Sequence, residues 1–188
     1  MKQNSAYTNY PGCNPVDFIQ PETLARNAQL YFSQFERGQL LSAYELSILE
    51  LVHETLGNDY WYFVEFPLQL LCNKSEHTYL PKELWQFWVN SRVDIAIMNT
   101  SMGEHCRKAC LILECQSPWH DLDGAQQRDR TKAQIISSTG IPLIYVRYAD
   151  YPRVLHFWVA DGSESVDYNP FTYEGKVELA AFLRKHCL

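Results

Sequence analysis

Two short apolar runs in this chain each carry one acidic residue. Asp94 lies inside the run Val93 to Ile97, and Glu114 follows directly after Leu111, Ile112 and Leu113. A buried carboxylate costs several kcal/mol unless it is paired, hydrogen-bonded or bound to a cation. The β-branched residues around both acids favour strands, and the polar stretch 99–108 between them favours a hairpin. We therefore expect two antiparallel strands that bring both carboxylates to a site requiring a cation.

A third polar side chain belongs to the same pattern. Side chains alternate along a strand, so Gln116 should lie on the same face as Glu114, while Cys115 faces the other way. Carboxylate and amide oxygens are hard ligands that suit magnesium or manganese. The predicted metal ligands are Asp94 and Glu114, and Gln116 is expected to orient the attacking water or the ligand shell.

Asp94, followed by Glu114, Cys115 and Gln116, resembles the core of the PD-(D/E)XK nuclease superfamily. The order of the surrounding segments is similar to a bacterial domain-of-unknown-function family in the branch that includes very-short-patch-repair-like endonucleases. These segments are 42–45, 63–71, 127–132 and 140–147. The similarity covers about residues 40–150. It implies an α/β, restriction-endonuclease-like fold, with a mixed β-sheet flanked by helices, and metal-dependent hydrolysis of DNA.

This chain departs from the superfamily pattern at two positions. Val93 stands where a proline usually precedes the first acid, and Gln116 replaces the superfamily lysine. Because this chain lacks the lysine that the superfamily uses in catalysis, two functions stay open. One is a magnesium-dependent endonuclease. The other is a nuclease-like scaffold without catalysis that binds nucleic acid or a protein partner.

A helix expected over about residues 125–139 offers a replacement cation. Helical spacing from Ile135 and Ile136, which should face the sheet, puts Lys132 on or near the buried side. Lys132 could then stabilise charge at the scissile phosphate. The alternative is a surface pair with Asp129, three residues earlier. Gln127 and Asp129 are weaker accessory candidates.

Glu45 has two predicted roles. Ser42 followed by Glu45 is a capping-box pattern at the start of a helix that should end near Gly57. The resemblance adds that a glutamate of this helix sometimes joins the metal site. Glu65, in a strand expected over 60–72, should face solvent.

The predicted organisation has three parts. Residues 1–39 form an N-terminal helical extension, 40–150 the nuclease-like core, and 151–188 a C-terminal strand and helix packed on that core. Further expected elements are helices over 21–39 and 174–186, strands over 143–148 and 154–159, and an irregular connection or short helix over 73–90.

Composition restricts the partners. The 188 residues are 46% hydrophobic, enough for a substantial core, and the net charge of −6 argues against nonspecific coating of nucleic acid. Basic residues that could contact DNA, or form ordinary solvated surfaces, are Arg107, Lys108, Arg128 and Arg130. We expect DNA as the main partner, with a protein partner or a homodimer as further candidates. No membrane span or signal segment is expected, which favours a cytoplasmic protein.

A zinc site is a weaker alternative. Its ligands would come from His105, Cys106, Cys110, Cys115 and His120. No Cys-x-x-Cys pair is present, and Cys115 should point away from Gln116. We therefore expect reduced cysteines.

Overall fold

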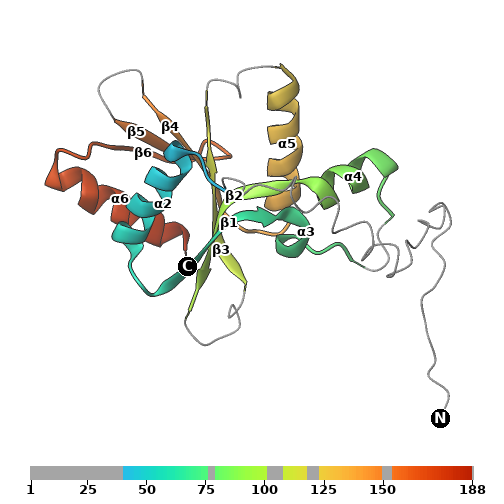
Figure 1. Cartoon of the computed structure of the whole chain (residues 1–188), viewed down its shortest axis with the longest axis horizontal. Helices are drawn as coiled ribbons and strands as arrows, with labels where there is room; N and C mark the ends of the chain where they lie inside the picture. Colours follow the sequence, from blue (N-terminus) through green and yellow to red (C-terminus); the bar gives the residue numbers. More distant parts are fainter. Residues whose placement is uncertain (1–39, 76–78, 101–107, 118–122, 150–153, 188) are drawn as a thin grey trace, which may run out of the picture. The chain divides into compact units, whose positions relative to one another are not determined.

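The computed structural model describes residues 40–75, 79–100, 108–117, 123–149 and 154–187, all within the compact unit Leu40–Leu188. The predicted extension 1–39 lies outside the described residues. The elements are α2 (Ala43–Leu56), β1 (Tyr60–Pro67), α3 (Leu68–Leu71), α4 (Lys82–Asn90), β2 (Arg92–Asn99), β3 (Ala109–Cys115), α5 (Asp123–Ser137), β4 (Leu143–Tyr148), β5 (Leu155–Val159), β6 (Ser165–Tyr168) and α6 (Tyr173–His186). Figure 1 shows their arrangement.

The strands form one six-stranded mixed sheet in the order β1-β2-β3-β4-β5-β6. β3 and β4 are parallel, because α5 carries the chain between them, and the other neighbours are antiparallel. The predicted pairing of the two acid-bearing strands is confirmed, with Ile95 opposite Leu113. The general prediction of an α/β mixed sheet flanked by helices is also confirmed.

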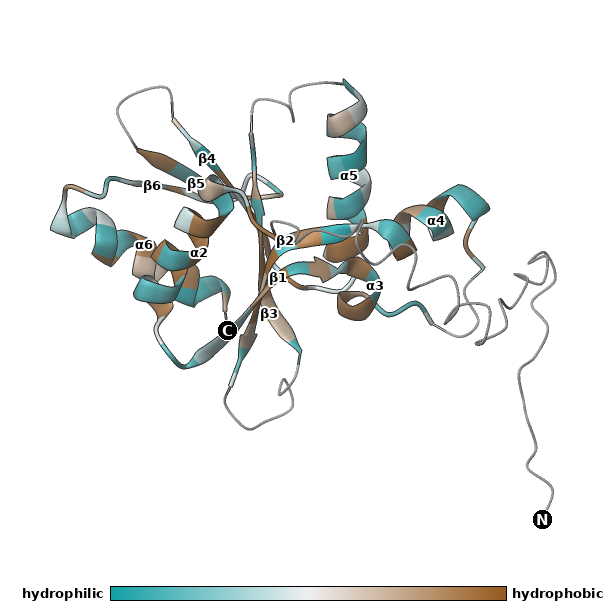
Figure 2. Cartoon of the chain, viewed as in Figure 1, coloured by the Kyte–Doolittle hydropathy of each residue, from teal (hydrophilic) through white to brown (hydrophobic). Residues whose placement is uncertain are grey.

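Helices cover both faces of the sheet. α2 and α6 contribute Ile48, Val52, Leu179 and Leu183 to one core, together with Ile95 and Leu113 of the central strands. α3, α4 and α5 lie on the other face, where Ile136 packs in a second core that includes Ile112 and Leu143. The central strands are therefore apolar on both sides, as their hydropathy in Figure 2 shows.

The end of the first predicted strand is corrected, whereas the short helix that was one alternative for 73–90 is confirmed. The first strand stops at Pro67 rather than reaching Cys72, and the short helix α3 follows. Proline has no N–H to continue a ladder, and the next amide, Leu68 N, donates to Ser91 O instead. The segment 73–90 contains a nine-residue helix, α4, whose Trp88 Nε1 donates to Cys72 O at 2.8 Å. The strand β6 was not predicted.

The pleat of β1 and β2 breaks at the same level in both strands. Phe63 and Phe66, three residues apart, pack in one core with ring centroids 5.3 Å apart, and Val93 and Ala96 share that core. In a regular strand, residues three apart face opposite sides. The register between the strands is continuous on either side, which puts Glu65 opposite Asp94 at the break.

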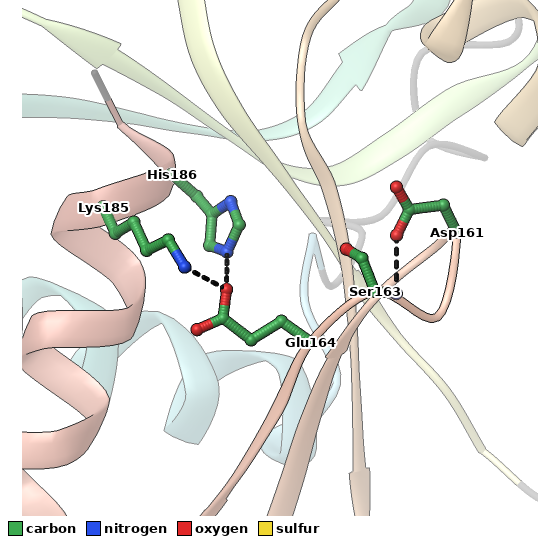
Figure 3. A network of polar contacts seen from close by, with 5 residues as sticks. All are labelled: Asp161, Ser163, Glu164, Lys185 and His186. Carbon is green, nitrogen blue, oxygen red and sulfur yellow. Dashed lines mark hydrogen bonds and ion pairs between the residues drawn. The ribbon is translucent and has the colours of Figure 1, made fainter.

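The C-terminal end of α6 is held against the turn between β5 and β6. Lys185 Nζ and His186 Nε2 lie 2.7 and 3.2 Å from Glu164 Oε2, as Figure 3 shows. Within the turn, Asp161 accepts the Ser163 amide at 2.8 Å. No helix among the described residues is long and apolar enough to cross a membrane.

Candidate functional site

A lysine and a glutamate meet beneath α5. Lys132 Nζ lies 2.7 Å from Glu114 Oε2, and the exposed fractions of these side chains are 15% and 2%. Lys132 is four residues before Ile136, which is fully buried in the core, so both residues share the inner side of the helix. The partner of Lys132 in the structure is thus Glu114 of β3, which supports the inward orientation predicted from helical spacing.

Only one oxygen of Glu114 is satisfied by this contact. Oε1 is buried and has no hydrogen-bond partner among the described residues. Burial raises the pKa of Glu114 above that of an ordinary glutamate, and the charge of Lys132 opposes the rise. A buried carboxylate oxygen without a partner is unusual in proteins, and a proton, a cation or a water molecule would satisfy it.

Asp94 belongs to β2, and its side chain reaches the neighbouring strand β3. The backbone pairing of these strands ends at Ile95 and Leu113. Beyond that pair, the amide of Cys115 donates to the Asp94 side chain, at 2.6 Å from Oδ2, rather than to a backbone carbonyl of β2. Burial raises the pKa of Asp94; the Cys115 hydrogen bond and Lys132 lower it, and Glu45 and Glu65 raise it further. The side chain therefore takes the place of a backbone acceptor while remaining close to two other acids.

Three carboxylates form an acidic cluster around Asp94. One oxygen each from Glu45, Glu65 and Asp94 lies within 4.8 Å of the others, and all three residues are half-buried. Glu45 comes from the first turn of α2, where Ser42 and Glu45 make both bonds of the predicted capping box. The cap is confirmed, and the same glutamate also belongs to the cluster.

Glu65 is the member that sequence reasoning missed. It was expected to face solvent, but it lies beside Asp94 and Glu45. Its backbone φ is 49°, a left-handed conformation that is uncommon for a residue with a side chain. The pleat break described above turns Glu65 out of strict alternation, so a period-two pattern gives the wrong face.

The acidic cluster fits a divalent metal ion. Its three carboxylates are hard oxygen ligands, and their like charges destabilise one another unless a cation lies among them. The predicted ligand Asp94 belongs to the cluster, whereas Glu114 binds Lys132 and presents its unpartnered oxygen separately. A role of Glu114 as a direct metal ligand stays a prediction.

The remaining predicted residues divide by burial. Gln116 Nε2 makes a long contact of 3.5 Å with Asp129 Oδ2, which places both beside the Glu114–Lys132 pair. The residues exposed to solvent are Lys108, Gln127, Arg128 and Arg130. Arg107 lies outside the described residues.

The zinc alternative gains no support. Cys115 packs in the core beneath α2 and α6, and the metal-type cluster among the described residues consists of carboxylates. His105, Cys106 and His120 lie outside the part of the chain that the structure describes.

The sheet brings together an acidic cluster, a buried lysine–glutamate pair and a glutamine. No family model, curated protein or solved structure matches this chain.

Proposed function

We propose that this protein is a divalent-metal-dependent phosphodiesterase that cleaves DNA, with a restriction-endonuclease-like fold of the PD-(D/E)XK type. The order α2, β1, β2, β3, α5, β4 agrees with the order of segments on which the resemblance rests. Asp94 and Glu114 lie on adjacent strands of one sheet, as that resemblance requires.

One observation carries the proposal. A lysine from α5 reaches Glu114 at 2.7 Å, on the strand where Gln116 replaces the superfamily lysine. The helix thus supplies a cation beside the acidic site, although the strand does not. Surface ion pairs are common and carry little information about function. A lysine held against a 2% exposed carboxylate is different, because burying both charges costs desolvation free energy, and a role in the site would explain that cost.

Each residue of the site has its own proposed role in the reaction. Glu45, Glu65 and Asp94 would hold magnesium or manganese, which polarises a phosphate and lowers the pKa of bound water. Lys132 would stabilise negative charge that develops on the phosphoryl oxygens. Glu114 positions Lys132 through their ion pair, and Gln116 and Asp129 would orient a water or a phosphate oxygen beside them.

The binding module without catalysis is the second candidate. The observation that favours it is the same contact, because Glu114 already occupies Lys132 and a closed pair needs no substrate. The free oxygen of Glu114 argues for the enzyme, since a purely structural pair would be expected to satisfy both carboxylate oxygens.

The test is cleavage of labelled single- and double-stranded DNA with magnesium or manganese. We compare the wild type with Asp94→Asn and Glu114→Gln, which keep the shape of each side chain and remove its charge. Asp161→Asn is the matched control, because Asp161 is an acid in the β5–β6 turn, away from the cluster. All four proteins are purified identically.

We expect both site variants to lose cleavage by at least about a hundredfold, with Asp161→Asn unchanged. Equal cleavage by all four proteins would reveal a contaminant and overturn the enzymatic proposal. Absence of cleavage in every preparation, with DNA binding retained, would establish the binding module instead.

A further inference from the structure

One half of the sheet has an uncovered face among the described residues. Along β5, Leu155, Phe157 and Val159 are buried in the core beneath α2 and α6, while His156 and Trp158 face the other way and are half-buried. The edge strand β6 shows the same alternation, with Ser165 and Asp167 exposed. Figure 1 shows α2 and α6 on the opposite side of these strands.

Three rings form a continuous row across this face. Tyr145 of β4 is directly opposite Trp158 of β5, with ring centroids 5.5 Å apart, and the His156 ring stacks on Trp158 at 5.3 Å and 22°. His156 is in turn fixed by Asp167, whose Oδ1 lies 2.6 Å from Nδ1. We call Tyr145, Trp158 and His156 the aromatic row. A half-buried tryptophan on a sheet face that no described helix covers presents a flat apolar ring, and such rings are common at binding surfaces.

The aromatic row begins at the candidate site. Tyr145 is the register partner of Glu114 in the parallel ladder between β3 and β4, so both side chains share one face. Burial, followed by the charges of Asp129 and Glu114, raises the pKa of Tyr145 to about 12, which agrees with its place beside these acids. At the next level of the sheet, Arg147 is opposite His156.

We propose that the aromatic row stacks the bases of a single-stranded DNA segment whose phosphate reaches Lys132. The choice of DNA as the substrate rests on the proposed function; the stacking surface and the strand form are new. Planar rings bind planar bases with little sequence preference, and only unpaired bases are free to stack on protein. Lys132 places positive charge at the Glu114 end of this path, where a phosphate of such a strand would reach it.

The experiment measures binding without cleavage, using fluorescence anisotropy of a labelled oligothymidylate in the absence of divalent metal. Trp158→Ala should weaken binding about tenfold or more, because loss of one base–aromatic stack has an effect of this size. Trp158→Phe keeps a ring and should stay close to the wild type, which separates stacking from misfolding. Trp61→Ala is the matched control, because Trp61 is a 57% exposed tryptophan on β1.

A second probe isolates the bases from the phosphates. An abasic oligomer of the same length and charge should bind the wild type about as weakly as oligothymidylate binds Trp158→Ala, and it should not distinguish the two proteins. Equal binding of both probes to the wild type, or equal loss in Trp158→Ala and Trp61→Ala, would overturn the stacking proposal. The same holds if duplex DNA of equal length binds better than the single strand.

The two proposals can fail separately. If Trp158→Ala cleaves DNA as fast as the wild type in the presence of metal, the stacking proposal is overturned and the nuclease proposal is retained. Base-dependent binding through Trp158, in a protein that cleaves no DNA, would support the aromatic row and overturn the enzyme.

Discussion

Two lysine–glutamate pairs in this protein have the same length and opposite surroundings. Lys132 meets Glu114 at 2.7 Å, and Lys185 meets Glu164 at 2.7 Å. The Glu114 side chain is 2% exposed, whereas that of Glu164 is 35% exposed and also contacts His186. Distance alone therefore does not separate a site from a surface contact. The difference lies in desolvation, because the buried carboxylate lost its water and gained one partner, while the exposed one kept its water.

The largest expected difference between the pairs is in catalysis. Lys132→Met should lower metal-dependent DNA cleavage by about 10²- to 10³-fold, because a positive charge next to the phosphate is lost. Lys185→Met removes the same charge from the exposed pair and should leave the rate unchanged. Single-turnover cleavage rates of the two variants test the contrast, and a similar loss in both would mean that the Lys132 charge has no local role.

Stability should also separate the pairs. Lys132→Met leaves Glu114 buried without its cation, and we expect a loss of about 3 kcal/mol in the free energy of unfolding. Adding Glu114→Gln should restore much of that loss, since the uncompensated charge is then gone. Lys185→Met should have a much smaller effect, because its pair is exposed to solvent. Urea denaturation of these three variants and of Glu114→Gln alone measures these differences, and additive effects in the double variant would contradict the coupling.

Metal binding should affect the buried region and leave the exposed pair unaffected. Magnesium or manganese at a hundredfold excess over its dissociation constant should stabilise the wild type by about 2.7 kcal/mol, because the folded cluster binds the ion and the unfolded chain does not. Glu65→Gln should reduce this gain, whereas Glu164→Gln should keep it. Melting temperatures with and without EDTA provide the measurement. A gain that is insensitive to Glu65 would move the metal away from the acidic cluster.

The smallest effect is the pH dependence of the exposed pair. The hydrogen bond from Lys185 lowers the pKa of Glu164 in the folded state; burial opposes this, and the charge of Lys185 and the His186 contact lower the pKa further. Its contribution to stability is therefore present above the unfolded pKa of about 4.3 and is lost as the pH falls through the lower folded value. Melting temperatures of the wild type and Glu164→Gln should differ at neutral pH and converge in acid. A constant gap across the range would rule out this linkage.

Several helices and strands of the fold could be predicted from local sequence signals. Ser42 and Glu45 mark the start of α2 because a capping box satisfies backbone N–H groups that have no carbonyl of a preceding helical turn to bind. The strand β4 was predicted with its observed bounds from the apolar run after Pro142. The inward orientation of Lys132 follows from its spacing to Ile136, since helical periodicity is little affected by what the helix packs against.

The parts that could not be predicted depend on contacts between distant segments. Glu65 joins the acidic cluster through its pairing opposite Asp94, which no property of the segment 60–67 reveals. The strand β6 has only four residues, and its role is set by β5 beside it. The pairing of Glu114 with Lys132 likewise depends on how α5 packs on the sheet. The sequence indicated that both residues belong to the site but not that they bind each other.

The shared pleat break at Glu65 and Asp94 links the lengths of two strands that are far apart in the sequence. Residues opposite each other in an antiparallel pair face the same side, so Glu65 and Asp94 leave the regular alternation together. Deleting Glu65 or Asp94 alone would slip one strand past its neighbour and turn apolar side chains outward. Deleting both would restore a regular ladder and remove two of the three clustered acids at once. The geometry of the sheet therefore couples the two acids, because a change in the length of one strand at this level shifts its register against the other.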